Sequence, residues 1–328
     1  MTVRIGVLGA ARIAPTALIS PARSVPEVEV AAVAARDRSK AEKFAKKHGI
    51  ATVHASYDDL LADPEIDAIY NPLPNGLHGR WTIAAVEAGK HVLCEKPFTA
   101  NAAEARRVAE VVKASDRVVM EAFHYRYHPQ TQRILDIVAS GELGEIRHVE
   151  TWMCIPLPLP GDIRWDLRLA GGSLMDVGCY TIHQLRTFAG AEPEVLRAEA
   201  KTIRDGIDRW ARADLRFPDG RTGRITAAML SARVLSLGAR IEGSAGTLQV
   251  RNPTIPKLAG RMKVTVGGTS RVEKPDSVAT YLCQLRAFAG AVLRGESFPT
   301  TVDDAMANMA VIDAVYEATG LGVRQPTP

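Results

Sequence analysis

The chain has 328 residues, more than one hydrophobic core usually serves, so we expect two domains. Hydrophobic residues make up 46% and charged residues 24%, an ordinary balance for a globular protein, and the net charge of +4 comes from scattered basic residues rather than runs. This pattern excludes the basic-patch signature of a nucleic-acid partner, and no apolar stretch approaches the ~18 residues of a membrane span.

The N-terminus and the cysteines indicate the compartment. The first apolar run is short and β-branched, and Gly6 interrupts it, so it does not resemble a signal peptide. The cysteines are far apart and form no CxxC pair, which favours reduced, mostly buried thiols, no metal site and a cytoplasmic location. These cysteines are Cys94, Cys154, Cys179 and Cys283.

The first 122 residues alternate apolar, β-prone segments with segments of helical periodicity. Strands separated by single helices predict a parallel, doubly wound sheet, which binds ligands at the carboxyl ends of its strands. The expected strands are Val3–Leu8, Val28–Ala34, Ala51–His54, Ala68–Tyr70, His91–Cys94 and Val118–Ala122.

The pattern changes in residues 123–328, where strands follow one another at hairpin spacing. Strands without intervening helices predict a large, open, mainly antiparallel sheet, with helices on one face, in an α+β domain. The expected strands are Ile146–Cys154, Val195–Ile203, Ala211–Phe217, Gly223–Met229, Ala239–Glu242, Thr247–Val250 and Lys263–Val266. The expected helices are His128–Ser140, Ser173–Phe188, Val278–Arg294 and Val302–Thr319.

A dinucleotide-binding turn follows the first strand. Residues 9–14 form a degraded G-x-G-x-x-G pattern, in which Ala11 and Ala14 replace the second and third glycines. The preceding strand and the following helix favour dinucleotide binding over an ordinary turn, with the pyrophosphate at the helix N-terminus. The cofactor-binding residues expected here are Gly9, Ala10, Ala11, Arg12 and Ile13.

The tip of the second strand bears on the choice of nicotinamide cofactor. Asp37 has two interpretations, as the acid that binds a ribose 2′-OH or as the N-cap of the following helix, and we favour the cap. Arg36 and Arg38 are then expected to bind a 2′-phosphate, although solvated loop arginines are the plainer interpretation. The balance favours NADP over NAD.

Lys96 follows the fifth strand, at the edge of the sheet where the ligand is expected. Pro97 restricts the backbone of Lys96 and so fixes its direction. A lysine in partly desolvated surroundings can polarise a substrate oxygen, whereas a strand-end surface lysine is the default interpretation.

The helix expected at Ser173–Phe188 places Asp176, Tyr180 and His183 at i, i+4 and i+7, on one face. A phenol beside a lysine ammonium can accept a proton from an alcohol, with Asp176 orienting the pair. Gly178 inside the helix suggests close packing, for which a nicotinamide ring is one candidate. The competing interpretation is a polar stripe facing solvent.

Five segments together resemble the Gfo/Idh/MocA oxidoreductases: GVLGAARIAP, NPLPNGLH, CEKP, VVMEAFHYRYHP and GGSLMDVGCYTIH. The nearest likeness is to the subgroup of glucose–fructose oxidoreductase, dimeric dihydrodiol dehydrogenase and NADP-dependent xylose dehydrogenase, which carry tyrosine where the inositol enzymes carry histidine. The resemblance implies a Rossmann domain at residues 1–122 and a substrate-binding and oligomerisation domain at residues 123–328. It also implies a cis Lys96–Pro97 bond.

The resemblance also implies roles for individual residues. Lys96 and Tyr180 correspond to the catalytic pair, which Asp176 assists, and His183 stands where many members have Asp or Asn, which leaves the substrate open. Pro72, Leu73, Asn75 and His78 are expected along the cofactor, with Glu95 and Lys96 near its nicotinamide ribose. Arg126, Arg164, Trp165 and Tyr281 are candidates for the substrate pocket, each about as well explained as structural.

The leading hypothesis is an NAD(P)-dependent oxidoreductase, NADP favoured, that moves a hydride between the cofactor and a carbinol or carbonyl carbon of a sugar, polyol or cyclic diol. The alternatives are an NAD-assisted glycosidase with tightly bound cofactor, or a non-catalytic NAD(P)-binding sensor. Runs such as ARADLRF and GRITAAML suggest apolar side chains on both faces of the second sheet, which predicts a homodimer or homotetramer built through that sheet.

Overall fold

The computed structural model describes residues 1–157, 161–203 and 206–328. The chain divides into two compact units. The first holds Met1–His124, Tyr281–Met306 and Pro328, and the second holds Tyr125–Thr280 and Ala307–Thr327. The division follows His124, two residues after the expected boundary, and the segment Tyr281–Met306 returns to the first unit. The predicted boundary, drawn at one sequence position, therefore leaves Tyr281–Met306 outside the first unit.

The first unit is built on a six-stranded parallel sheet with the order β3-β2-β1-β4-β5-β6, which confirms the predicted doubly wound architecture. The strands are β1 (Val3–Leu8), β2 (Val28–Ala34), β3 (Thr52–His54), β4 (Ala68–Asn71), β5 (His91–Cys94) and β6 (Val119–Glu121). The helical elements are η1 (Pro15–Ile19), α1 (Ser20–Ala22), α2 (Arg38–His48), α3 (Tyr57–Ala62), η2 (Asn75–Leu77), α4 (His78–Glu87), α5 (Ala102–Lys113) and α8 (Thr280–Arg294).

Local side-chain caps explain where α2 and α5 begin. Asp37 accepts from the Lys40 amide at the start of α2, as predicted. At α5, Asn101 accepts from the Glu104 amide across 2.9 Å, and the Glu104 carboxylate accepts from the Ala100 amide across 2.8 Å. A capping box is therefore present at α5, with its return bond one residue earlier than usual.

The second unit is built on an eight-stranded sheet with the order β14-β13-β12-β11-β7-β10-β9-β8, in which β7 and β10 run parallel and the other pairs are antiparallel. The strands are β7 (Ile146–Cys154), β8 (Glu194–Thr202), β9 (Asp208–Arg216), β10 (Thr222–Ala228), β11 (Ser236–Gly243), β12 (Gly246–Arg251), β13 (Arg261–Val266) and β14 (Thr269–Glu273). Sequence analysis missed β14, which is short and polar.

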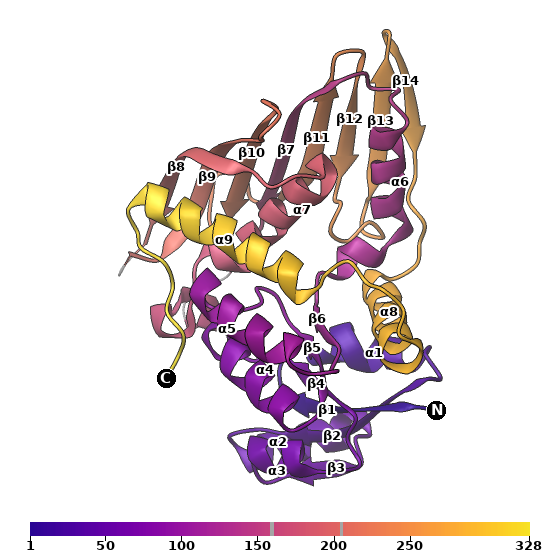
Figure 1. The fold of residues 1–328 in the computed structure, drawn as a ribbon, viewed down its shortest axis with the longest axis vertical. Helices are drawn as coiled ribbons and strands as arrows, with labels where there is room; N and C mark the ends of the chain where they lie inside the picture. The colour runs from indigo at the N-terminus through magenta and orange to yellow at the C-terminus, as the bar shows by residue number, and fades with distance from the viewer. Residues whose placement is uncertain (158–160, 204–205) are drawn as a thin grey trace. The chain divides into compact units, whose positions relative to one another are not determined.

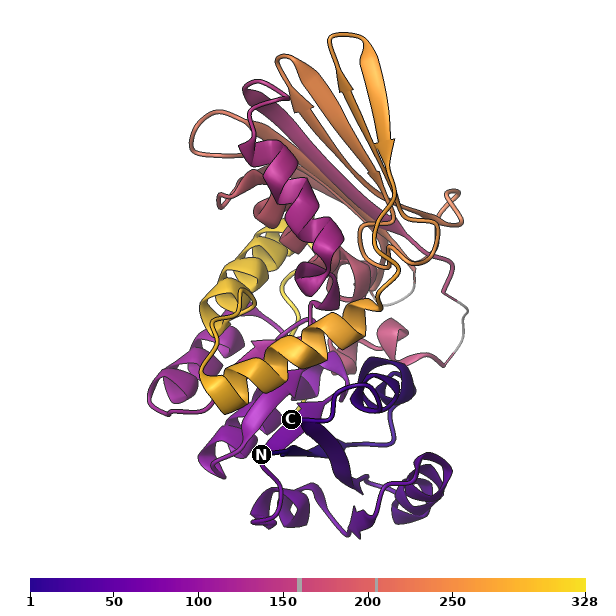
Figure 2. The same cartoon turned by 90° about the vertical axis from the view of Figure 1, so that its right-hand side faces the viewer.

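Helices cover one face of this sheet, as predicted. Figures 1 and 2 show α6 (Pro129–Ala139), α7 (Cys179–Ala189) and the unit's part of α9 (Val302–Thr319) on that face. The shorter helical elements are η3 (His124–Tyr127), η4 (Ile163–Trp165), η5 (Leu167–Leu169) and η6 (Leu174–Gly178). Within the described residues, no helix is both long and apolar enough to cross a bilayer.

The opposite face of the sheet carries charged side chains in ARADLRF, where apolar ones were expected, although GRITAAML does place the apolar Ala228 there, beside Trp210. In ARADLRF, Ala211, Ala213 and Leu215 are buried, while the alternate positions carry Arg212 and Asp214. Ion pairs then link neighbouring strands across that face: Arg197 and Arg224 with Asp214, each at 2.6 Å, and Arg212 with Glu199.

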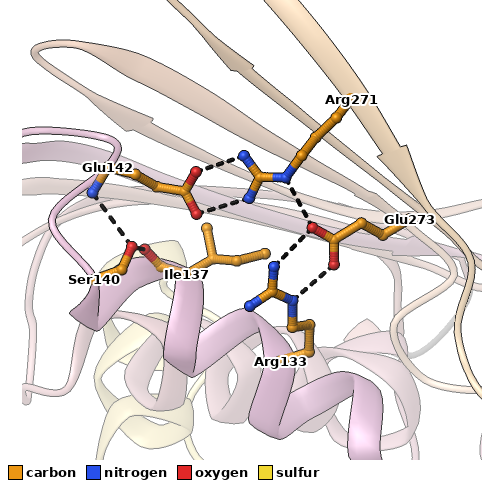
Figure 3. A network of polar contacts seen from close by, with 6 residues as sticks. All are labelled: Arg133, Ile137, Ser140, Glu142, Arg271 and Glu273. Atoms are coloured by element: carbon orange, nitrogen blue, oxygen red, sulfur yellow. Dashed lines mark hydrogen bonds and ion pairs between the residues drawn. The ribbon is translucent and has the colours of Figure 1, made fainter.

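A four-residue ion-pair network joins α6 to the edge strand β14 (Figure 3). Glu273 accepts two hydrogen bonds from Arg133, at 2.7 and 2.8 Å, and a third from Arg271 at 2.9 Å. Arg271 also binds Glu142 at 2.5 and 2.7 Å. The paired arginines hold the pKa of Glu273 down at about 2, and Arg133 is the larger cause.

Candidate active site

The turn after β1 has the geometry expected of a dinucleotide-binding turn. Gly9 has a φ of +83°, which favours glycine, and its amide donates to the Ala34 carbonyl on β2 across 2.6 Å. Ala14 is fully buried, as close packing of the following helix requires. That helix begins as a π-helical turn at Pro15 rather than as a regular α-helix.

The tip of β2 offers a cofactor an arginine rather than an acid. The Asp37 carboxylate accepts from the Ser39 hydroxyl at 2.9 Å and from the Lys40 amide, so it acts as a cap. Arg38 pairs with Glu42 at 2.9 Å along α2. Arg36 is exposed at the strand tip, next to the phenol of Tyr57, whose pKa burial raises and the Arg36 charge lowers. These residues fit a 2′-phosphate better than a free 2′-OH.

His78 connects the loop after β4 with the turn after β5. One ring nitrogen lies 2.7 Å from the Leu73 carbonyl and the other 2.7 Å from the Pro97 carbonyl. The ring is 1% exposed, and burial holds its pKa down at about 4 despite these two oxygens. Both ring nitrogens therefore contact backbone oxygens of the two loops, and the place along the cofactor that the resemblance implies for His78 stays a prediction. Of its loop neighbours, Pro72 and Leu73 are buried and Asn75 is half-buried.

The turn after β5 contains the predicted cis bond between Lys96 and Pro97. Glu95, which precedes them, is buried and accepts from the Tyr70 hydroxyl across 2.7 Å. Burial, and then the Glu95 charge, raises the pKa of Tyr281. The Tyr281 ring also lies 4.0 Å from the ring of His124, centroid to centroid. In the first unit, Lys96 therefore follows a buried carboxylate in a polar, aromatic environment.

In the second unit, the helix that carries Tyr180 is buried rather than solvent-facing. Tyr180 is 5% exposed and His183 is 1% exposed, so the competing interpretation of a solvent-facing stripe was wrong. The Tyr125 hydroxyl lies 2.5 Å from Nδ1 of His183, and the rings of Tyr125 and Tyr180 are 6.2 Å apart. The structure thus adds Tyr125, which the sequence gave no signal to select because His183 lies far along the chain.

Asp176 is paired with an arginine. Its Oδ1 accepts from Arg164 Nε across 2.9 Å, and Arg164 Nη1 also binds Asp162 at 3.1 Å. The Asp176 charge raises the pKa of Arg164, burial lowers it, and the Asp162 charge raises it again. The net shift of the Arg164 pKa is upward. The guanidinium therefore stays charged, and the carboxylate is compensated within a nearly buried site.

The helix begins as the π-turn η6 at Leu174–Gly178 and becomes regular only at Cys179. A Cβ at Gly178 would lie 2.6 Å from Leu174 Cδ1 and 3.3 Å from the Cβ of Ala227 on β10. The close packing inferred from Gly178 is therefore with Leu174 and with the sheet.

The remaining predicted substrate residues differ in their surroundings. Trp165 is buried in an apolar cluster with Val177, Ile207, Ala227 and Met229, so most of its side chain is structural. Arg126 is half-buried in η3. Of the predicted site residues, the first unit brings together Leu73, His78, Glu95 and Lys96, and the second brings together Arg164, Asp176, Tyr180 and His183.

Two family models match this chain. Residues 3–123 match the Gfo/Idh/MocA oxidoreductase family with its NAD-binding Rossmann fold, and residues 131–249 match the C-terminal domain of the same family. The chain belongs to the Gfo/Idh/MocA family. It is an NAD(P)-binding oxidoreductase.

Named relatives and a solved structure cover most of the chain. It is 38% identical to D-xylose 1-dehydrogenase (NADP(+)) 2 of Haloferax volcanii over 97% of each chain. It is 32% identical to trans-1,2-dihydrobenzene-1,2-diol dehydrogenase of Sus scrofa over 69% of this chain and 67% of that one. KijD10, a 3-ketoreductase from Actinomadura kijaniata solved with NADP and TDP-benzene, matches with a TM-score of 0.90 and 30% identity over 97% of this chain and 98% of that one. KijD10 has also been solved with a tyrosine changed to phenylalanine and with a lysine changed to alanine.

Proposed function

We propose that this protein is an NADP-dependent dehydrogenase or reductase acting on a CH–OH or C=O carbon of a sugar, polyol or cyclic diol, with Lys96 and Tyr180 as its catalytic residues. The observation that carries the proposal is the buried phenol of Tyr180, which shares its helix with the compensated carboxylate of Asp176 and with the Tyr125–His183 pair. The relatives named above are, by their names, a D-xylose dehydrogenase, a dihydrodiol dehydrogenase and a 3-ketoreductase.

The KijD10 variants support the choice of Lys96 and Tyr180. The lysine and the tyrosine replaced in those variants are separated by the same number of residues as Lys96 and Tyr180 are here. Both residues also lie where the sequence predicted them. Lys96 follows β5, and Tyr180 is in the first turn of α7.

In the proposed reaction, the Lys96 ammonium donates a hydrogen bond to the substrate hydroxyl, and the phenolate of Tyr180 accepts the hydroxyl proton. As that O–H bond breaks, the C–H electron pair leaves the carbinol carbon, and the carbon becomes a carbonyl. NADP⁺, when bound, supplies the acceptor for that electron pair and its hydrogen. In the reverse direction, Tyr180 returns the proton. The positive charge of Lys96 favours the phenolate, and Arg164 compensates Asp176, which would otherwise disfavour it.

The cofactor preference is proposed from the tip of β2. Asp37 serves as a helix cap, and Arg36 remains exposed beside Tyr57, which supports binding of a 2′-phosphate. Gly9, Ala10, Ala11, Arg12 and Ile13 are proposed to hold the pyrophosphate.

We also propose that two or four copies associate through the eight-stranded sheet. The sequence argument for this was an apolar sheet face, and the argument from the structure is a face with charges of both signs. The uncovered face carries arginines and carboxylates that pair across strands, such as Arg224 with Asp214. A surface with both charges can pair with a second copy of itself, and such an interface weakens as salt rises. Sedimentation at low and high salt tests this, and a monomer at both salt concentrations would contradict it.

The function is tested by offering aldoses, polyols, dihydrodiols and glycosides with NADP⁺, using substrates that carry deuterium on the reacting carbon. Transfer of the deuterium to the nicotinamide, with net NADPH formed, supports the proposal. Substrate cleavage with no net reduced cofactor would instead identify a glycosidase with retained cofactor. Tight sugar binding without any turnover would identify a sensor.

A further inference from the structure

A fully buried carboxylate lies beside the start of the segment that carries Tyr180. Asp208, at the first position of β9, is 0% exposed. Its Oδ2 accepts from the Ser173 hydroxyl at 2.8 Å and from the Leu174 amide at 2.7 Å. Its Oδ1 accepts from the Tyr316 hydroxyl on α9 at 2.9 Å. Asp208 thus binds the first residues of the π-turn that leads into α7.

Arg324, in the segment after α9, supplies the compensating charge. Its Nη2 lies 2.7 Å from Asp208 Oδ1, and its Nε donates to the Gly171 carbonyl across 2.9 Å. The guanidinium carbon is 4.2 Å from the centre of the Tyr316 ring, and the residue is only 5% exposed. The fork of one arginine therefore binds both Asp208 and the backbone just before the π-turn.

Gly172 leaves the space that this cluster occupies, and Gly171 beside it lies close to the backbone of Arg164. Gly172 has a φ of +134°, and a Cβ there would lie 2.1 Å from Asp208 Oδ1 and 2.9 Å from the Tyr316 hydroxyl. A Cβ at Gly171 would lie 2.5 Å from the Arg164 carbonyl. The Asp208 carboxylate occupies the space that a side chain at position 172 would need, so Gly172 and Asp208 require one another.

Gly172 in turn contacts both partners of the ion pair near Tyr180. Its amide donates to the Arg164 carbonyl across 2.9 Å, and its carbonyl accepts from the Asp176 amide across 3.0 Å. Any shift of Gly172 would therefore move the backbone of Arg164 and of Asp176 together, one helical turn before Tyr180.

We infer that Asp208 and Arg324 are positioning residues for the reaction: together they fix the Gly171–Leu174 segment and, through it, the Arg164–Asp176 pair and the start of the Tyr180 helix. The inference rests on the proposed role of Tyr180 for its effect on turnover. Its structural part, that Arg324 keeps this segment ordered, does not depend on that role.

The test compares Arg324→Ala and Arg324→Lys with the control Arg216→Ala, which removes an exposed arginine paired with Glu194 at the sheet edge. Arg324→Ala should lower kcat about tenfold or more with little change in NADP⁺ affinity, the scale of one lost charge-assisted contact. Arg324→Lys keeps the positive charge but loses the forked guanidinium, so its kcat should lie between that of the unmodified protein and that of Arg324→Ala. Hydrogen exchange in residues 171–180 should quicken in both variants and stay unchanged in the control.

Guanidinium at concentrations that leave the fold intact should restore kcat and slow exchange in Arg324→Ala, because it refills the position of the lost group. A residue that merely stabilised the fold would not respond in this direction, since guanidinium weakens folded proteins in general. If Arg324→Ala does not fold, the hydrogen exchange and the kcat of Arg324→Lys test the inference in its place. Unchanged exchange at residues 171–180, or an equal loss of kcat in Arg216→Ala, would overturn the inference. Full turnover by Tyr180→Phe would instead refute the proposed function, and the exchange result would still stand.

Discussion

Arg164 and Asp176 form an ion pair at 2.9 Å, although Asp176 was expected to assist the catalytic pair and Arg164 was a separate candidate for the substrate pocket. The pair joins the turn η4 to the helix that carries Tyr180. Because the guanidinium compensates the carboxylate, Asp176 adds little unfavourable charge near a phenol that must ionise. In the proposed chemistry, Asp176 can therefore assist from its place on the Tyr180 helix, because Arg164 neutralises its charge.

Replacing Arg164 with alanine leaves a nearly buried carboxylate without its partner, so we expect turnover to fall about tenfold, the scale of one lost charge-assisted hydrogen bond. Steady-state kinetics with the best substrate measures the effect. Arg168→Ala is the matched control, because Arg168 is an exposed neighbour that pairs with Asp166. An equal effect of the two substitutions would show that the Arg164–Asp176 pair has no special role.

Arg36→Ala should weaken NADP binding much more than NAD binding, because the side chain is proposed to meet the 2′-phosphate that only NADP carries. Fluorescence titration of both cofactors measures this difference. Arg38→Ala is the control, since Arg38 pairs with Glu42 along α2 and should shift both affinities little. Equal losses for NADP and NAD in the Arg36 variant would count against the assignment.

His78→Phe keeps a buried ring but removes both contacts to the Leu73 and Pro97 carbonyls. We expect the free energy of unfolding to fall by about 1–2 kcal/mol, the net scale of one or two hydrogen bonds, and NADP binding to weaken as the Leu73 loop loosens. Urea unfolding and cofactor titration measure the two effects. His48→Phe, at the end of α2, is the control; normal stability and affinity in His78→Phe would contradict the linking role.

Glu273 should contribute a pH-dependent increment of stability. Its pKa is about 2 in the folded chain and 4.5 ordinarily, so the contribution is present above about pH 4.5 and is lost as pH falls toward 2. We expect about 1 kcal/mol at neutral pH, because much of the network in Figure 3 is exposed to solvent and screened. Urea unfolding of Glu273→Gln against the unmodified protein should show this difference at pH 7, less of it at pH 3 and less in high salt. A difference that grows as pH falls would be the wrong sign.

Sequence reasoning succeeded where the determinants are local. The positive φ of Gly9, the cap at Asp37 and the Lys96–Pro97 turn each depend on a few adjacent residues, and each has the predicted local structure. It failed for the strand ARADLRF of the second sheet, where the period-2 alternation separates apolar from charged side chains more cleanly than we expected.

The side-chain contacts around the Tyr180 helix, all within the second unit, join segments that are distant in the sequence. Tyr125 with His183, and Asp208 with Arg324, are separated by 58 and 116 residues. No periodicity or spacing in the sequence connects such pairs, because only the folded sheet and helices bring them together.

The most direct measurement of the central claim is the turnover of Lys96→Ala, Tyr180→Phe and the double variant on the best substrate, with NADP affinity determined for each. Each single substitution should lower turnover by about 10²-fold or more, the usual scale for a lost acid–base group, while NADP affinity changes far less. The double variant should be little worse than the worse single one, because the two residues act as a unit. Near-normal turnover by either single variant would contradict the account and leave Lys96 a strand-end residue without a catalytic role.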